Sequence, residues 1–271
     1  MPRVDVLVPT YRRPAALAVT LAGLVGQSER DFRVVVSDQS EEDASTDGAE
    51  ANALVRILFA RGQEVVVHRR RWRRGMAEQR QFLLDRARSP FVLFLDDDVL
   101  LLPDALELLL EAIEEERCGF VGFGLVGASF ADDVRRDEEE IAFWDGPVRP
   151  ERVRPGDLAW ERHRLHNAAN LLHLERRLGA RLNGGRRYKV AWIGGCVLYD
   201  VEKLRAAGGF GFWRELPREH AGEDVLAQIR VMERFGGCGL LPSRAYHQEL
   251  ATTVRERSVD APRVLPVRSP A

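Results

Sequence analysis

The segment that most constrains the fold of this chain is an apolar run that ends in three consecutive aspartates. Residues 91–95 read Phe-Val-Leu-Phe-Leu and lead directly into Asp96, Asp97 and Asp98. A short apolar run of this kind predicts a strand buried on both faces. Adjacent carboxylates repel one another unless a cation neutralises them. The segment therefore indicates either a polar site at the end of a buried strand or a solvated acidic turn before the next helix.

The spacing of the acids bears on which ligand they would hold. If strand alternation continues, Asp96 and Asp98 lie on one side of the chain and Asp97 lies on the other. Two carboxylates on one side supply the oxygen ligands that a hard divalent cation such as Mg²⁺ or Mn²⁺ prefers. A metal site is the functional interpretation of this segment.

Composition limits the class of protein. The chain has 271 residues, 45% apolar and 30% charged, with a formal net charge of −2, as expected of a globular protein without nucleic acid as a partner. Its three cysteines show no metal-binding spacing, which predicts buried thiols. No signal-peptide pattern or transmembrane segment is evident, so a cytoplasmic protein is expected, with peripheral membrane contact left open. Composition does not indicate the oligomeric state.

Strand and helix patterns alternate over the first part of the chain. Strands are expected at 4–8, 32–37, 65–68, 91–95 and 119–124, and helices at 14–25, 51–59 and 76–88 and from Pro103 onward. This order predicts an α/β fold with a Rossmann-like, mostly parallel sheet and helices on both faces. Ligands of such sheets bind at the carboxyl ends of the strands, where Asp38 and Asp96 to Asp98 are expected.

The pattern changes after Ser129. An amphipathic helix is expected over 158–182, a strand over 190–195, a short helix over 201–207, a further helix within 219–235, and a last strand over 238–241. Residues 251–271 are rich in Arg, Pro and Ser, which predicts a mobile C-terminal tail. Residues 1–250 are expected to form a single domain.

A series of motifs in this chain resembles the family 2 glycosyltransferases, which have the GT-A fold. The matching segments are Val6 to Pro14 (VLVPTYRRP), Val34 to Asp38 (VVVSD), Asp96 to Asp98, Trp192 to Gly195 (WIGG), Gly208 to Phe210 (GGF) and Glu223-Asp224. The resemblance covers Val4 to about His247, with nothing recognised between 129 and 187. It implies a nucleotide-binding half at 1–125, an acceptor-binding half at 126–250, and metal-dependent, inverting sugar transfer from a nucleotide-sugar donor. The acceptor would be a glycan, a lipid-linked sugar or a small molecule.

The resemblance also implies roles for individual residues. The residues expected to bind the nucleotide or donor are Pro9, Thr10, Tyr11, Arg13, Asp38, Arg74, Arg80, Asp96, Asp97, Gly194 and Gly195. The metal, Mn²⁺ or Mg²⁺, would be held by Asp96, Asp98 and His247. Asp224 matches the catalytic base, and Glu223 would be its neighbour in the acceptor site. The family pattern Asp-Gly-Ser is replaced here by Asp38-Gln39-Ser40, which leaves the base preference open.

The chemistry of sugar transfer explains why such groups are needed. Departure of a nucleoside diphosphate builds negative charge on its phosphates, which a bound cation offsets. The attacking hydroxyl must lose a proton, so a carboxylate base is required within hydrogen-bond reach. Structural alternatives remain: Asp38 could cap a loop, Asp224 could interact with a helix dipole, and His247 could be a packing residue.

Other functions fit parts of the sequence. A nucleotidyltransferase on a related fold would usually have a Gly-rich loop after the first strand, and residues 9–14 lack one. A non-enzymatic nucleic-acid-binding protein could use the segment Arg69 to Arg74, which includes Trp72, although the balanced net charge argues against it. A catalytically inactive family member is less consistent with a full set of acids.

Overall fold

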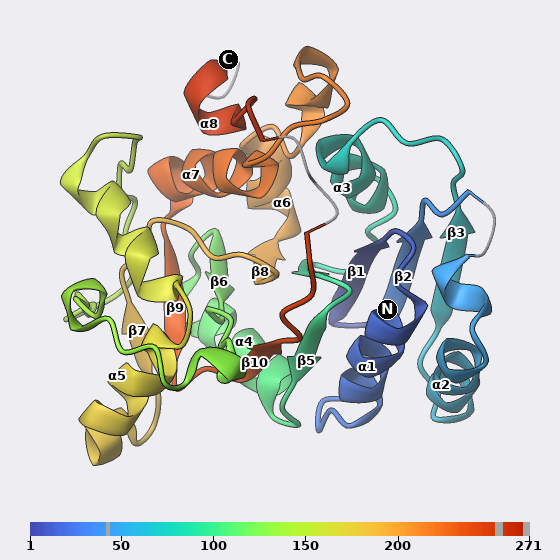
Figure 1. Ribbon diagram of the computed structural model, residues 1–271, viewed down its shortest axis with the longest axis horizontal. Helices are drawn as coiled ribbons and strands as arrows, with labels where there is room; N and C mark the ends of the chain where they lie inside the picture. The colour runs from blue at the N-terminus through green and yellow to red at the C-terminus, as the bar shows by residue number, and fades with distance from the viewer. Residues whose placement is uncertain (42–43, 253–256, 268–271) are drawn as a thin grey trace.

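A mixed eight-stranded sheet runs through the whole molecule, as the computed structural model of residues 1–41, 44–252 and 257–267 shows (Figure 1). The strand order is β3-β2-β1-β4-β8-β6-β9-β7. The strands are β1 (Val4–Thr10), β2 (Phe32–Asp38), β3 (Val65–Arg69), β4 (Phe91–Leu95), β6 (Phe120–Gly122), β7 (Arg186–Tyr188), β8 (Cys196–Asp200) and β9 (Gly237–Leu241). The β3-β2-β1-β4 half is parallel, and β8 is antiparallel to both β4 and β6. The predicted α/β fold with a mostly parallel sheet is confirmed.

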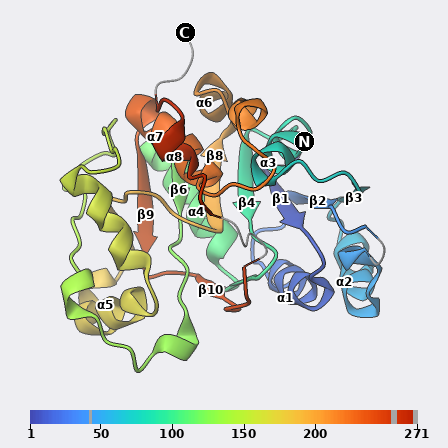
Figure 2. The same ribbon diagram turned by 45° about the horizontal axis from the view of Figure 1, so that its top comes forward.

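Helices cover both faces of this sheet, as Figures 1 and 2 show from two directions. One face is covered by α1 (Pro14–Val25), α2 (Ala49–Ala60) and α4 (Ala105–Glu116). The other is covered by α3 (Met76–Leu84), α6 (Val201–Ala206) and α7 (Glu223–Phe235). Alternate side chains of a strand point to opposite faces of the sheet and pack in different cores. Leu7 packs on the α3 side, whereas Val6 and Val8 pack on the α1 side.

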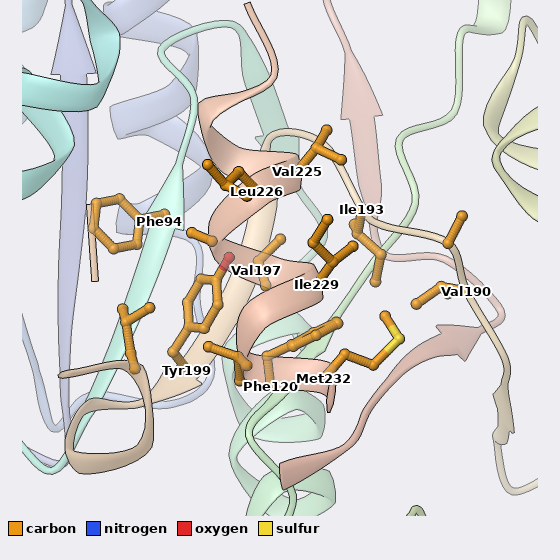
Figure 3. Close-up of a cluster of buried hydrophobic side chains, with 14 of the residues drawn as sticks. Phe94, Phe120, Val190, Ile193, Val197, Tyr199, Val225, Leu226, Ile229 and Met232 are labelled. Atoms are coloured by element: carbon orange, nitrogen blue, oxygen red, sulfur yellow. The ribbon is translucent and has the colours of Figure 1, made fainter. Parts of the chain in front are cut away.

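The core beneath α7 fixes the position of that helix on the sheet. Figure 3 shows apolar side chains of α7 directed toward side chains of β4, β6 and β8. The labelled residues of the helix are Val225, Leu226, Ile229 and Met232, and those of the strands are Phe94, Phe120, Val197 and Tyr199. Because this packing anchors the first turn of α7, it also holds Glu223 and Asp224 in place.

A second, two-stranded sheet was not expected from the sequence. It pairs β5 (Val99–Leu101) antiparallel with β10 (Ala245–His247), and it delays the start of α4 to Ala105. In this register His247 lies opposite Val99, the residue that follows Asp98. The pairing therefore brings the predicted histidine ligand next to the acidic segment.

The strand expected over 190–195 is wrong, because β8 begins only at Cys196. The preceding segment is held by a side chain instead of a neighbouring strand. Gln228 of α7 accepts a hydrogen bond from the Ile193 backbone N–H at 2.8 Å and donates one to the Ile193 carbonyl at 2.6 Å. The apolar residues of this segment are therefore those of a buried loop and not of a strand.

The continuous helix expected over 158–182 is also wrong. Only α5 (Asn170–Leu178) is α-helical, between 3₁₀ segments at Leu158–His166 and Gly179–Leu182. Ala168 has a φ of 46°, which breaks the helical path. Asn170 donates to the Arg164 carbonyl at 3.0 Å and thereby satisfies a backbone group at this break.

Part of the predicted C-terminal tail is packed against the domain. Helix α8 (Ala261–Val264) lies beside α7, and the Ala261 side chain is fully buried. Arg230 of α7 donates to the Pro266 carbonyl at 2.6 Å. Within the predicted tail, Ala261, Pro262 and Val267 are buried, whereas 253–256 and 268–271 lie outside the described residues. The helices of the described part are too short to cross a membrane.

Candidate active site

A cavity of about 390 Å³ lies at the carboxyl ends of β1 and β4. We call it the acidic cavity. Its lining residues are Pro9, Thr10, Tyr11, Arg13, Met76, Gln79, Asp96, Asp97, Asp98, His247, Leu250, Thr252 and Arg257. The parallel pairing of β1 with β4 brings the loop after the first strand and the three aspartates together at one edge.

The three aspartates divide between two arginines. Arg13 donates to Asp98 Oδ2 at 2.5 Å and to Asp97 Oδ1 at 3.2 Å, and Thr10 Oγ1 donates to Asp97 Oδ2 at 2.6 Å. Asp96 instead accepts a hydrogen bond from Arg80 at 3.0 Å. The expected alternation, with Asp96 and Asp98 on one side, is wrong because β4 ends at Leu95 and the chain turns at the acids.

The environment shifts the pKa values of two of these acids in opposite directions. Burial raises the pKa of Asp97 to about 6, against the opposing effects of Thr10 and Arg13. Burial also acts to raise the pKa of Asp98, but hydrogen bonds from His247 and Arg13 outweigh it and hold the pKa below its ordinary value. Asp98 is therefore kept ionised more readily than Asp97.

His247 completes this group from the other end of the chain. Its Nε2 lies 3.4 Å from Asp98 Oδ2, and its Nδ1 accepts a hydrogen bond from the Glu249 backbone N–H at 3.0 Å. The hydrogen bond with Asp98 raises the pKa of His247. The β5–β10 pairing positions this imidazole.

The acidic cavity contains donor atoms of the kinds that a divalent cation accepts. Asp96, Asp98 and His247 all line it, and carboxylate oxygen and imidazole nitrogen are ligands that Mn²⁺ accepts. As the side chains stand, the described residues hold no group of three acids or histidines set to bind a metal. The Arg13 guanidinium supplies the positive charge beside Asp97 and Asp98.

A second cavity of about 510 Å³, which we call the basic cavity, adjoins the first. The two share Tyr11, Arg13, Met76, Gln79 and Thr252. Arg73 stacks on the Tyr11 ring, with its guanidinium carbon 3.8 Å from the ring centroid. Arg12 and Arg218 add further positive charge to the lining. Together the cavities offer an aromatic ring, cations and carboxylates along one continuous wall.

Asp38 and Arg74 line neither cavity. The buried Asp38 carboxylate accepts hydrogen bonds from the backbone N–H groups of Ser40 at 2.9 Å and Thr46 at 3.2 Å, which is the loop-capping arrangement. The exposed Arg74 lies against the rings of Trp72 and Trp213 instead. Their expected contacts with a nucleotide stay predictions.

Arg80 is a buried link between the acidic cavity and α7, and it lines neither cavity itself. It donates to Asp96 at 3.0 Å and to Glu223 Oε1 at 3.1 Å, with 5% of its side chain exposed. Burial acts to lower the pKa of Arg80, but the carboxylates of Asp96 and Glu223 raise it. The arginine therefore holds the first aspartate and the start of α7 in a fixed relation.

Asp224 follows in the first turn of α7, outside the lining of the acidic cavity. It accepts a hydrogen bond from the Val225 N–H at 2.9 Å, as an acid at a helix N-terminus does. Removal from water and then the charge of Glu223 raise the pKa of Asp224 to about 7, against the opposing charge of Arg80. A carboxyl group with such a pKa can accept a proton near neutral pH.

The two glycines of the WIGG motif have different surroundings. Gly195 has a φ of 73°, and a Cβ there would meet Leu125 Cδ1 at 2.7 Å and Asp96 Oδ2 at 3.3 Å. Its carbonyl accepts a hydrogen bond from the Asp96 backbone N–H at 2.9 Å. A Cβ on Gly194 would meet nothing within 4 Å. Gly195 therefore allows the close approach to Asp96, whereas Gly194 faces open space.

Sequence reasoning missed several residues that build the cavities. Gln79, 1% exposed, lines both and donates to the backbone carbonyl of Ser37 at 2.7 Å and of Thr10 at 3.3 Å. The polar residues Glu78, Gln79 and Arg80 in α3 were a signal in the sequence that could have indicated a polar site beside this helix. Leu250 also lines the acidic cavity, as do Thr252 and Arg257, which lie where a tail was expected.

Solved structures with a similar fold include a mannosyltransferase. Staphylococcus aureus TarS 1–349 superposes with a TM-score of 0.60 at 17% identity over 91% of this chain and 60% of that chain. The mannosyltransferase PcManGT from Pyrobaculum calidifontis, in complex with GDP-Man and Mn²⁺, has a TM-score of 0.51 at 18% identity over 88% of this chain and 56% of that chain. The fold is thus that of the GT-A glycosyltransferases.

The sequence comparisons identify the family. The family model described as glycosyl transferase family 2 matches residues 5–173, and the chain belongs to this family. A GalNAc(5)-diNAcBac-PP-undecaprenol beta-1,3-glucosyltransferase of Campylobacter jejuni is 28% identical over 116 residues, which are 42% of this chain and 36% of that protein. An uncharacterized glycosyltransferase of Haemophilus influenzae is 26% identical over 113 residues, 41% of this chain and 34% of that protein. The matches span about a third of these curated relatives.

Proposed function

We propose that this glycosyltransferase transfers a sugar from a nucleotide-sugar donor to an acceptor hydroxyl, with inversion and with the help of a divalent cation. The observation that carries the proposal is the grouping of Asp96, Asp98 and His247 in one cavity beside a ring- and arginine-lined cavity. This arrangement matches the two ends of a nucleoside diphosphate, which are a planar base and a charged pyrophosphate.

The donor would lie along the wall that the two cavities share. Tyr11 and Arg73 form a stacked pair against which the base would lie. Arg13, now paired with Asp97 and Asp98, would bind the phosphates of the donor instead. Asp98 and His247, with Asp96, would hold Mn²⁺ or Mg²⁺, which supplies Lewis-acid stabilisation of the leaving diphosphate. The hydrogen bond from Thr10 to Asp97 would hold the loop after β1 against the acidic segment.

Asp224 would act as the base that accepts the proton of the acceptor hydroxyl. Its raised pKa suits this role. The hydrogen bonds of Arg80 to Glu223 and Asp96 hold the start of α7 at a fixed position relative to Asp96. A single displacement by the hydroxyl inverts the anomeric centre. Glu223, whose carboxylate is bonded to Arg80, would position Asp224 and border the acceptor.

The acceptor class is a glycan, a lipid-linked sugar or a small molecule. The name of the Campylobacter jejuni relative includes a substrate linked to undecaprenol. An acceptor of that kind would require contact with a membrane surface. The proposed location is the cytoplasm, with peripheral membrane association if the acceptor is lipid-linked.

A screen of nucleotide sugars tests this function. The protein is incubated with UDP-, GDP-, dTDP- and CDP-linked sugars in the presence of Mn²⁺, and the released nucleoside diphosphate is measured. We expect release from one nucleotide class, dependent on the cation. The absence of binding and turnover with every donor would contradict the proposal.

A further inference from the structure

A third cavity adjoins the acidic cavity at His247. Its volume is about 490 Å³, and it shares His247 and Leu250 with the acidic cavity. Its walls come from the segments after β6, around 163–168 and around 192–194, which include the part of the sequence where no motif was recognised. We call it the aromatic cavity. A group bound there lies next to the acidic cavity without displacing the aspartates.

The lining combines apolar rings with neutral or acidic polar groups. The residues that the argument uses are Leu125, Phe130, His163, Asn167, Trp192 and Glu249. No lysine or arginine of the described chain belongs to the lining. His166, also in the wall, is bonded to the Tyr188 hydroxyl at 2.8 Å, and burial lowers its pKa to about 4, so it is uncharged at neutral pH.

This chemistry selects among possible occupants. A phosphate finds no lysine or arginine in the lining, and the imidazole of His247, whose pKa is raised, is already paired with Asp98. Glu249 would also repel a phosphate. A hydrocarbon chain offers no hydrogen bond to the Asn167 amide, which donates to Glu138 at 3.0 Å, or to the Glu249 carboxylate, which accepts from the Ser129 N–H at 3.1 Å. The remaining polar groups of both side chains would lose water without replacement. A pyranose satisfies both parts, because its C–H faces contact aromatic rings while its hydroxyl rim bonds to amide and carboxylate oxygens.

The aromatic wall is held rigidly before any ligand binds. His163 stacks on Trp192 with centroids 4.9 Å apart and planes inclined by 10°, and Trp160 packs 4.6 Å from Trp192. His163 Nδ1 bonds to the Trp160 carbonyl at 2.8 Å. Gln228 fixes the backbone between Trp192 and Gly194. Such preorganisation reduces the entropy lost when a ligand binds.

We propose that the aromatic cavity binds a sugar ring of the acceptor, so that the acceptor is a carbohydrate or carries a terminal sugar. This inference rests on the proposed function, since it places the acceptor beside a donor in the acidic cavity. Trp192 and His163 form the ring contact, and Asn167 and Glu249 contact the hydroxyl groups. A sugar seated there borders Gly194, whose missing side chain leaves room for it.

The test uses the donor found in the screen and a panel of methyl glycosides of common hexoses and N-acetylhexosamines as acceptors. Transfer to at least one glycoside and slow hydrolysis of the donor without acceptor are measured for wild type, His163→Ala and Trp192→Ala. We expect kcat/KM for the glycoside to fall about tenfold or more in both variants, equivalent to about 1.4 kcal/mol. The KM for the donor and the rate of donor hydrolysis should be unchanged.

Controls separate this inference from the proposed function and from unfolding. Phe59→Ala removes an exposed aromatic side chain on α2 and should leave every rate unchanged. Glu249→Gln tests the hydroxyl contact without removing the rings, and it keeps an oxygen that can accept from the Ser129 N–H. It should lower transfer while thermal unfolding stays close to wild type. Donor hydrolysis without transfer to any glycoside, or transfer unaffected by His163→Ala, would overturn the aromatic cavity as the acceptor site. Absence of any donor turnover would overturn the proposed function and this inference with it.

Discussion

Asp224 is the residue whose chemistry depends most on its surroundings. Burial, followed by repulsion from Glu223, raises the pKa of this carboxyl group to about 7. Asp98 is instead held ionised by His247 and Arg13. Neighbouring acids thereby acquire different protonation states at one pH, which is what a base beside an anion-binding site requires.

The proposed base predicts a pH dependence of transfer. Below about pH 7 Asp224 is protonated and cannot accept the acceptor proton, so kcat should rise with pH through this value. Asp224→Asn should abolish transfer and leave nucleotide binding intact. The matched control Glu202→Gln changes a first-turn acid of α6 and should leave the profile unchanged. Unaltered transfer by Asp224→Asn would remove this residue from the role.

The same shift has a consequence for stability. Because the folded-state pKa of Asp224 is raised, its stabilising contribution is present at pH values below its ordinary pKa and is lost as pH rises through about 7. Asp224→Asn should therefore unfold at a higher temperature than wild type at pH 8, with a smaller difference at pH 5. Equal differences at both pH values, in thermal unfolding, would contradict the shifted pKa.

Secondary-structure elements differ in how far the sequence predicts them. The strands β1, β2 and β4 and the helices α1 and α4 follow from local periodicity, because each buries side chains of its own repeating pattern. The β5–β10 pair could not be predicted, since each strand has three residues and the partners are far apart in the chain. The segment 190–195 has the composition of a strand, but its backbone at Ile193 is hydrogen-bonded by the Gln228 side chain. Gln228 is distant in the sequence, so no local pattern predicts this contact.

The two hydrogen bonds of Gln228 predict that a single side chain fixes the WIGG segment. Gln228→Met keeps the volume but leaves the buried N–H and C=O of Ile193 unpaired, which should lower the free energy of unfolding by about 2–5 kcal/mol. Chemical denaturation measures this loss, and amide hydrogen exchange at Ile193 should accelerate. Unchanged exchange would show that another group holds the loop.

A buried ion pair joins β1 and β2 at the end opposite the cavities. Asp5, with 0% exposure, accepts two hydrogen bonds from Arg33 at 2.9 Å and others from the N–H groups of Arg88 and Ser89. Burial acts to raise the pKa of Asp5, but these bonds outweigh it and lower the pKa. Its contribution to stability is complete above the ordinary pKa and is lost as pH falls below it.

Asp5→Asn should therefore destabilise the fold by about 3–5 kcal/mol in urea unfolding at pH 7, because it leaves the Arg33 charge buried. Glu64→Gln is the matched control: this carboxylate lies 3.9 Å from the same arginine but is half exposed, so the change should cost less than about 1 kcal/mol. Similar losses in both variants would contradict the role assigned to burial.

On the scale of the whole molecule, the site combines residues from both ends of the chain. The aspartates and the loop after β1 could be predicted from the sequence, because they follow strands whose ends meet at one edge. His247 was a candidate only through the family resemblance, because its position depends on the β5–β10 pair. The sequence could not predict that Arg13 lies between Asp97 and Asp98, that Arg80 turns away to Glu223, or that Leu250 and Thr252 cover the cavity. Those placements depend on contacts between residues far apart in the sequence.

The central claim is that the acids of one cavity hold a divalent cation beside a nucleoside diphosphate, and calorimetric titration with UDP and GDP tests it most directly. At least one nucleotide should bind about tenfold or more tightly with Mn²⁺ than with a chelator, a difference of about 1.4 kcal/mol or more. Asp98→Asn should abolish that difference, whereas Asp104→Asn, which removes an acid paired with Arg244 outside the cavity, should preserve it. Binding that is indifferent to Mn²⁺, or equally strong in Asp98→Asn, would contradict the claim.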